Sequence, residues 1–136
     1  MLPDGDLSLH GLKVLLVEDN VDNLQLSTFL FESYGADVIA VSSASDAFQA
    51  LLERQPDILV SDIGLPDESG YTLIRRIRAL SVEEGGQTLA IALTGSVQES
   101  DRKQALAAGF QQHLSKPVGT DTLLKTVLNV VSTKIG

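Results

Sequence analysis

The sequence predicts a single α/β domain in which a doubly wound, parallel sheet of five strands is covered by five helices. Short apolar runs alternate along the chain with longer segments of helical periodicity, and this alternation occurs five times. Most of the runs are apolar on both faces, which is typical of parallel strands that are covered by helices on each side. A strand, a crossover helix and a parallel strand, repeated with short loops, form an open doubly wound sheet.

Each of the five runs has the length of a strand. The first four consist mainly of aliphatic residues, whereas the fifth is weaker because it contains Gln, His and Ser. The expected strands are Lys13–Val17, Asp37–Val41, Ile58–Val60, Leu89–Leu93 and Gln112–Ser115.

The segments between the runs carry the signals that start and end helices. Asn20 precedes the first helix and Gly35 follows it. Ser43 and Asp46 form a capping box at the start of the second helix, which ends before Pro56. The expected helices are Val21–Tyr34, Ala44–Arg54, Ser69 or Gly70 to Leu80, Glu99–Ala108, and Thr120 to about Thr133.

Length and composition exclude several kinds of site. The chain has 136 residues, the usual size of one domain, and such a domain folds without disulfides or a structural metal. We expect tails at residues 1–10 and 134–136 around a domain at residues 11–133. There is no cysteine, which excludes thiol nucleophiles, thiolate zinc sites and iron–sulfur clusters. The two histidines, His10 and His113, are too few for an HExxH or a three-histidine metal site.

The charge of the chain limits its partners. A net charge of -8 opposes binding to the phosphates of DNA or RNA and to an anionic membrane. The apolar runs are far shorter than the roughly 18 residues of a membrane span, and the N-terminus lacks the basic and apolar regions of a signal peptide. We therefore expect a cytoplasmic protein without direct nucleic-acid binding or membrane insertion, and we expect it to be a monomer.

Polar side chains follow four of the five runs, at the points where the strands would end. Glu18 and Asp19 follow the first run, Asp62 the third, Thr94 the fourth and Lys116 the fifth. Doubly wound sheets bind ligands in the crevice beyond the carboxyl ends of their strands. We therefore expect three carboxylates, a hydroxyl group and an ammonium group to converge on this edge of the sheet.

Three carboxylates at such an edge require a cation. At an effective dielectric constant of about 20, two carboxylates ~4 Å apart repel each other by several kcal/mol. The charges of Glu18, Asp19 and Asp62 are balanced by a divalent ion together with Lys116. Oxygen ligands favour Mg²⁺ or Mn²⁺. Carboxylates, a metal, a lysine and a hydroxyl group are the parts of a phosphoryl-transfer site in which an aspartate is the nucleophile.

The motifs at this edge resemble those of the receiver domain of two-component response regulators. They are Val17-Glu18-Asp19-Asn20, Ser61-Asp62-Ile63-Gly64-Leu65-Pro66-Asp67-Glu68-Ser69-Gly70, Ala92-Leu93-Thr94-Gly95 and Leu114-Ser115-Lys116-Pro117. No single motif is specific, but the set in this order on five strand–helix units is, and the resemblance covers about residues 11–133. It implies a flavodoxin-like sheet with the strand order 2-1-3-4-5.

The resemblance also implies how the acidic residues act. Asp62 would be the phosphoacceptor and would take the phosphoryl group from a histidine of a histidine kinase or a histidine phosphotransfer protein. Asp19 and Asp62 would bind Mg²⁺ directly, Glu18 would bind it mainly through water, and the backbone carbonyl of Gly64 would complete the protein ligands. The domain would then change conformation to signal, as a phosphoacceptor rather than as an enzyme in its own right.

Four further positions follow from the same resemblance. Thr94 would hydrogen-bond the phosphoryl group, Lys116 would pair with it, and Pro117 would follow a cis peptide bond. His113 stands where receivers usually carry Tyr or Phe, an aromatic residue that turns inward in many of them as the threonine moves. We expect His113 either to bias the switch through a charge that changes between about pH 5 and 8, or to be an exposed histidine without that role.

The first helix offers a candidate docking surface for the phosphodonor. On a helical wheel its core stripe runs through Ser27, Leu30 and Tyr34. The apolar residues beside this stripe that are predicted to dock the partner are Val21, Leu24 and Phe31. Additional core packing is the alternative interpretation of the same residues.

Several other interpretations stay open. The chain resembles receivers fused behind hybrid sensor histidine kinases, and a stand-alone single-domain regulator is the other possibility. A degenerate receiver that acts only as a protein-docking module is the main rival. A flavodoxin-like electron carrier would share the fold, but Glu18 and Asp19 would repel the phosphate of FMN. An aspartate-nucleophile phosphatase would need an acid where Gly64 stands.

Individually, the polar residues also have purely structural interpretations. Glu18, Asp19 and Asn20 could merely cap a helix and complement its dipole. Asp67 is expected to be a solvated acid in the loop after Pro66.

Overall fold

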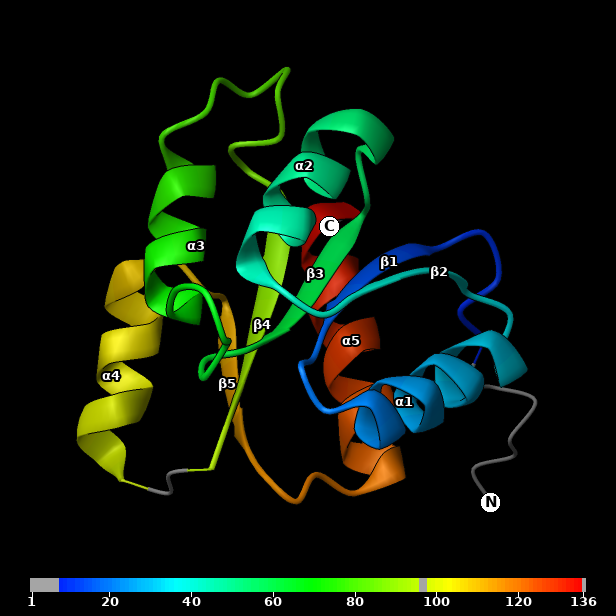
Figure 1. Cartoon of the computed structure of the whole chain (residues 1–136). Coiled ribbons are helices and arrows are strands. Elements are labelled where there is room, and N and C mark those ends of the chain that lie inside the picture. Colours follow the sequence, from blue (N-terminus) through cyan, green and yellow to red (C-terminus); the bar gives the residue numbers. More distant parts are fainter. Residues whose placement is uncertain (1–7, 96–97, 136) are drawn as a thin grey trace.

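The computed structural model describes residues 8–95 and 98–135, in which strands and helices alternate along the chain as predicted (Figure 1). The strands are β1 (Lys13–Val17), β2 (Asp37–Val41), β3 (Ile58–Asp62), β4 (Leu89–Thr94) and β5 (Gln112–Ser115). The helices are α1 (Val21–Ser33), α2 (Ala44–Arg54), α3 (Gly70–Arg78), α4 (Glu99–Ala108) and α5 (Thr120–Ile135).

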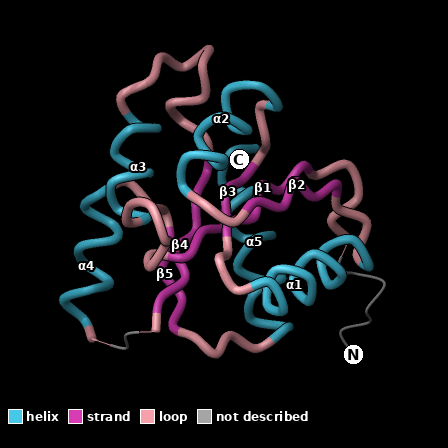
Figure 2. The backbone as a smooth tube through the Cα atoms, in the orientation of Figure 1, coloured by secondary structure: helices cyan, strands magenta, loops and turns pink. Residues whose placement is uncertain are grey.

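The strands form one parallel sheet in the order β2-β1-β3-β4-β5 (Figure 2). This confirms both the predicted fold class and the strand order. The chain moves outward from β1 in both directions, to β2 on one side and to β3 on the other. The carboxyl ends of β1 and β3 therefore border the crevice at the switch in strand order, where ligands of doubly wound sheets bind.

The two faces of the sheet bury separate apolar cores. Val14 and Leu16 of β1 pack toward α1 and α5, whereas Leu15 and Val17 pack toward α2, α3 and α4. Figure 1 shows the same division, with α1 and α5 together on one side of the sheet. Because successive strand residues point to opposite faces and both faces are covered, nearly every residue of the central strands is apolar.

Local signals start the helices where the sequence predicts. The Asn20 side chain accepts a hydrogen bond from the Asn23 N–H at 2.9 Å, and Ser69 accepts one from Thr72 at the start of α3. Helix ends differ by one or two residues from the prediction. Tyr34 is the cap residue after α1, α3 ends at Arg78, and α5 extends to Ile135.

Two strands are longer at their carboxyl ends than the apolar runs predict. Strand β3 continues to Asp62 and β4 continues to Thr94. Both polar residues belong to the hydrogen-bonded sheet, where Asp62 is paired with Leu93 of the neighbouring strand. The sheet therefore holds the backbone of both residues in place.

Leu9 precedes the predicted domain boundary, yet it is part of the core. Its side chain is 2% exposed, and its N–H donates a 2.7 Å hydrogen bond to the carbonyl of Tyr34. This residue closes the amino end of the sheet between β1 and the end of α1. Within the described part of the chain, none of the helices combines the length and the apolar character that crossing a membrane requires.

Arg78 connects three segments at the end of α3. Its Nε and Nη2 donate to the carbonyl of Gly109 at 3.0 and 2.8 Å, and its Nη1 donates to the carbonyls of Gly86 and Thr88 at 3.0 and 2.7 Å. A Cβ at Gly109 would lie 2.8 Å from the Arg78 Cγ. Burial lowers the pKa of Arg78. The guanidinium thus links α3 to the segment before β4 and to the turn between α4 and β5.

We predict that Arg78→Met destabilises the domain by about 2–4 kcal/mol, because methionine leaves three carbonyl oxygens without their donor. Denaturant unfolding monitored by circular dichroism measures the change. The control is Arg75→Met, which removes an exposed arginine from the same helix. Equal stability of the two variants would show that the Arg78 contacts contribute nothing.

Candidate functional site

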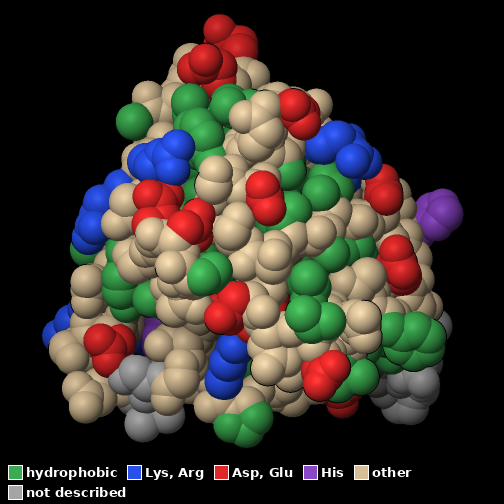
Figure 3. Space-filling model, viewed as in Figure 1, with side chains coloured by type: hydrophobic (Ala, Val, Ile, Leu, Met, Phe, Trp, Pro, Cys, Tyr) green, Lys and Arg blue, Asp and Glu red, His purple; other side chains and the backbone are tan. Residues whose placement is uncertain are grey.

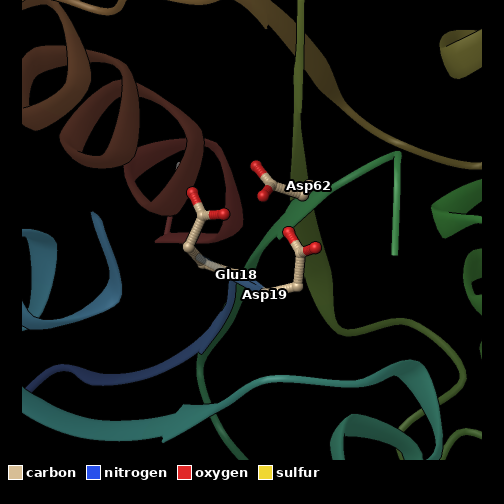
Figure 4. A group of neighbouring side chains, drawn as sticks. All are labelled: Glu18, Asp19 and Asp62. Carbon is tan, nitrogen blue, oxygen red and sulfur yellow. The ribbon is translucent and has the colours of Figure 1, made fainter. Parts of the chain in front are cut away.

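Three carboxylates lie together at the carboxyl edge of the sheet. Glu18 and Asp19 follow β1, and Asp62 is the last residue of β3. Their oxygen atoms lie within 4.8 Å of one another, and Figure 4 shows the three carboxylates directed into the same space. Glu18 and Asp62 are buried, with 6% and 3% of their surface exposed, whereas Asp19 is exposed. The predicted convergence of these residues is confirmed.

Lys116 brings a positive charge to the two buried carboxylates. Its Nζ lies 3.0 Å from Glu18 Oε1 and 2.8 Å from Asp62 Oδ1. The backbone N–H of Lys116 donates to the carbonyl of Thr94 at 2.6 Å. The bond between Lys116 and Pro117 is cis, as the resemblance implied. The end of β5 is thereby joined to β4 and to the ends of β1 and β3.

The buried charges shift each other's protonation. Burial, with Glu18 alongside, raises the pKa of Asp62 to about 7. Burial would also raise the pKa of Glu18, but hydrogen bonds with Asp62, Asn20 and Lys116 lower it. Burial would lower the pKa of Lys116, but its close contacts and ion pairs with Asp62 and Glu18 raise it. Lys116 therefore compensates only part of the charge of the carboxylates.

The donor set fits a hard divalent cation. Oxygen atoms of three carboxylates can reach one ion, and oxygen ligands are those that Mg²⁺ prefers. Asp62 Oδ1 is buried and, among the described residues, accepts no hydrogen bond of good geometry although Lys116 Nζ is near. The predicted ligands Glu18, Asp19 and Asp62 thus form a cluster able to hold a metal ion.

The remaining predicted site residues lie on the neighbouring strands and on the loop after β3. Thr94 is the half-buried last residue of β4, and Gly64 is exposed in the loop between β3 and α3. His113 lies on β5 opposite Ala92. The His113 side chain is half-buried, and its Nε2 is buried without a hydrogen-bond partner in residues 8–95 and 98–135. The side chain is thus less exposed than one interpretation expected, and a role of His113 in switching stays a prediction.

A glycine brings α3 close to the phosphoacceptor candidate. The N–H of Gly70 donates to the carbonyl of Ile63 at 2.7 Å. A Cβ at Gly70 would lie 2.6 Å from the carbonyl oxygen of Asp62, closer than any side-chain carbon can approach. Only glycine permits the first turn of α3 to pack against the end of β3 in this way.

The prediction that three residues of α1 form a docking surface is wrong in part. Phe31 is fully buried in the core, and Leu24 is half-buried against the same core, whereas Val21 is 62% exposed. The helix is rotated so that Phe31, rather than Leu30, lies deepest. Apolar residues occur around most of α1, so its sequence pattern does not define one core stripe.

A groove beside the carboxylate cluster is a feature that the sequence did not reveal. Its volume is about 740 Å³, and its lining includes Glu18 and Lys116 together with side chains of α1 and of the segment entering α5. Leu26 and Phe29 of α1 also line it and are 71% and 73% exposed. The walls come from distant parts of the chain, which explains why no local pattern indicated the groove.

Asp67 is exposed in the loop after Pro66, as predicted, but its carboxylate is also bound to another part of the chain. Its Oδ1 accepts a 2.9 Å hydrogen bond from the N–H of Ala44, and its Oδ2 accepts a 2.8 Å bond from the N–H of Ser45. The side chain remains at the surface. No sequence signal indicated this contact, because its partners precede it by more than twenty residues.

The surface has charges of both signs. On the face in Figure 3, Lys and Arg side chains are separated by acidic and uncharged side chains. This mixed pattern agrees with the net charge of -8, and the visible face carries no continuous basic patch of described residues.

Comparison with known proteins supplies the family. The model of the response regulator receiver domain matches residues 14–128. An uncharacterized 14.6 kDa protein of Leptolyngbya boryana is 39% identical over 121 residues, which cover 88% of this chain and 90% of that protein. Hybrid signal transduction histidine kinase D of Dictyostelium discoideum is 34% identical over 90% of this chain. The virulence sensor protein BvgS of Bordetella pertussis is 36% identical over 90% of this chain.

The matches to the two kinases each concern one segment of a much longer protein. The chain spans 8% of the Dictyostelium kinase and 10% of the Bordetella sensor. Among solved structures, the receiver domain of sensor histidine kinase PA1611 from Pseudomonas aeruginosa has a TM-score of 0.81 and 31% identity. The alignment covers 90% of this chain and 98% of that domain, in which a magnesium ion is coordinated in the active-site cleft.

A putative response regulator from Chloroflexus aurantiacus has a TM-score of 0.83 and 26% identity, over 89% of this chain and 98% of that one. Sequence, fold and site geometry thus agree, and the chain belongs to the receiver domains of two-component systems and is related to the receivers of hybrid histidine kinases.

Proposed function

We propose that this domain accepts a phosphoryl group on Asp62 from a phosphohistidine of a histidine kinase or a histidine phosphotransfer protein, and that this event switches its conformation. The observation that carries the proposal is the position of Asp62, buried within 4.8 Å of two other carboxylates and 2.8 Å from Lys116 Nζ. A docking module without phosphoryl chemistry would need none of these side chains. Their joint presence at one edge favours the phosphoacceptor.

The proposed reaction is an in-line transfer between two side chains. A carboxylate oxygen of Asp62 attacks phosphorus, the bond from phosphorus to the donor nitrogen breaks, and that nitrogen keeps the electron pair. Lys116 pairs with a phosphoryl oxygen, and the hydroxyl group of Thr94 donates a hydrogen bond to another. The ends of β3, β4 and β5 carry these groups, which would limit the reorganisation that the reaction needs.

The reaction is proposed to require Mg²⁺, or Mn²⁺ in its place. The bound ion would offset the negative charge of the carboxylates and of the transferred group. Asp19 and Asp62 would bind it directly, Glu18 mainly through water, and the carbonyl of Gly64 would complete the protein ligands. The magnesium ion in the active-site cleft of the 31% identical Pseudomonas receiver supports the binding of Mg²⁺ at this site.

The phosphodonor is proposed to dock along the groove beside α1. Glu18 and Lys116 belong both to this groove and to the carboxylate cluster, so a helix in the groove would lie next to Asp62. Leu26 and Phe29, together with Val21, present exposed apolar surface on α1. An amphipathic helix that carries the donor histidine could cover these side chains. As a partner of such donors, the domain would act in the cytoplasm.

Asp62 is predicted to be the single site of modification. Exposure of the wild-type domain to Mg²⁺ and a small phosphodonor should add about 80 Da, the mass of one phosphoryl group. Asp62→Asn should abolish the gain, because the amide is not a nucleophile, whereas the control Asp37→Asn, at the other end of the sheet, should retain it. Intact-mass spectrometry measures both. Stoichiometric modification of Asp62→Asn would contradict the proposal and favour the docking module.

The raised pKa of Asp62 predicts how stability depends on pH. The pKa of Asp62 is about 7 in the folded domain, whereas the ordinary value for an aspartate is 3.8. Folding therefore favours the protonated carboxyl group, and this contribution is present below about pH 4 and lost as the pH rises through about 7. In the metal-free domain, ionisation of Asp62 should therefore lower the free energy of unfolding more at pH 8 than at pH 5.

We predict that Asp62→Asn stabilises the domain in EDTA by an amount on the order of 1–3 kcal/mol at pH 8 and by less at pH 5. Mg²⁺ should stabilise the wild type at pH 8 but stabilise Asp62→Asn much less. Denaturant unfolding with EDTA or Mg²⁺ at both pH values measures these differences. The same effect of the substitution at pH 5 and pH 8 would show that Asp62 is not destabilised by ionisation.

Docking at the groove predicts a difference between two phosphodonors. Leu26→Asp with Phe29→Ser should slow transfer from the cognate phosphohistidine protein by on the order of tenfold or more, while leaving modification by a small donor nearly unchanged. The matched control is Leu106→Asp, which adds the same charge at a partly exposed position on α4. Equal loss with both donors would indicate damage to the site instead, and no loss with either would exclude this surface.

A further inference from the structure

Two neighbouring acids tie the loop after Asp62 to the helices on one face of the sheet. Asp67 accepts hydrogen bonds from the N–H groups of Ala44 and Ser45 at the start of α2. Glu68 forms a 2.7 Å ion pair with Arg76 of α3. The Arg76 guanidinium lies 4.2 Å from the centre of the Phe48 ring of α2. The loop, α2 and α3 are thereby joined to one another.

The contact of Asp67 is specific in geometry because it uses both carboxylate oxygens. The first N–H groups of a helix have no partner within the helix. In α2 the first two are bound by Asp67, and the third, that of Asp46, is bound by Ser43 Oγ at 3.1 Å. Two parallel hydrogen bonds fix the direction of the carboxylate as well as its distance. The N–H groups of Ala44 and Ser45 also lower the pKa of Asp67, which keeps it ionised.

Gly64 has no side chain of its own to hold it, so its position in the loop depends on the contacts of its neighbours. The base of the loop is closed by the 2.7 Å hydrogen bond from Gly70 N–H to the Ile63 carbonyl. Ile63 and Leu65 pack partly against the core. Gly64 itself is exposed, and a Cβ at this position would touch nothing within 4 Å. The far side of the loop is held by Asp67 and Glu68.

We infer that Asp67 is a positioning residue for the metal site: its carboxylate, bound to the start of α2, holds the loop that carries Gly64 in place for ion binding. The inference rests on the proposed function, in which the Gly64 carbonyl is a ligand. Asp67 does not touch the ion. It restricts the loop before the ion binds, so that less conformational entropy is lost on binding. Replacing Asp67 should therefore weaken the affinity for Mg²⁺.

The test compares Asp67→Ala and Asp67→Asn with the control Asp46→Ala. Asp46 is exposed in the first turn of the same helix, so its replacement removes the same charge without touching the loop. Calorimetric titration with Mg²⁺ at pH 8 measures affinity, and the rate of modification by a small phosphodonor is measured across Mg²⁺ concentrations. Thermal unfolding in EDTA checks that each variant is folded.

Asp67→Ala is expected to weaken Mg²⁺ binding by on the order of tenfold, as for other residues that support metal ligands, while Asp46→Ala stays close to wild type. Asp67→Asn should fall between them, because its amide oxygen retains one acceptor. At saturating Mg²⁺ the maximal rate of Asp67→Ala should approach that of the wild type. A damaged fold would instead lower the rate at every concentration.

Two results would overturn the inference. One is an unchanged Mg²⁺ affinity in Asp67→Ala. Where the alanine variant folds poorly, an unchanged affinity in Asp67→Asn has the same meaning. The other is an equal loss in both Asp67 variants and in Asp46→Ala, which would show an effect of charge alone. If either result is found while the wild-type domain binds Mg²⁺ and is modified, the inference fails but the proposed function does not. A wild-type domain that does neither refutes the proposed function itself.

Discussion

The repulsion between carboxylates at the end of the sheet is the constraint on which the site depends. Glu18 and Asp62 are both buried, Asp19 lies beside them, and one ammonium group contacts the two buried acids. Burial, with Glu18 alongside, raises the pKa of Asp62 to about 7, whereas contacts with Asp62, Asn20 and Lys116 lower that of Glu18. The site therefore has a residual affinity for positive charge, and a cation is what such a site accepts most readily.

The architecture of the sheet explains why these charges meet at an edge and nowhere else. The interior of β1, β3 and β4 is covered by helices on both faces, so apolar side chains occupy nearly all of it. Polar groups find space only where the strands end. Because the strands are parallel and β1 lies next to β3, the residues that end these two strands are neighbours. The same topology that excludes charge from the core concentrates it at the crevice.

The two sides of this crevice differ in how they are built. On the side of α2 and α3, the loop after Asp62 is bound by Asp67 and by Glu68 to neighbouring helices. On the side of α1 and α5, a groove of about 740 Å³ opens beside Glu18 and Lys116, with exposed apolar side chains along it. One side is thus closed by polar contacts within the chain, and the other has an open groove lined in part by exposed apolar side chains.

The sequence by itself determined the order of the elements, the fold class and the acidic edge. Hydrophobic periodicity and residues such as Asn20 and Ser43 act locally, and the ends of parallel strands necessarily share an edge. The tertiary structure alone decided the rotation of α1, the groove and the contact of Asp67. Apolar residues surround α1, so packing on the sheet, and not periodicity, buried Phe31 and exposed Leu26. The partners of Asp67 lie across the fold, and only the assembled chain brings the start of α2 to that carboxylate.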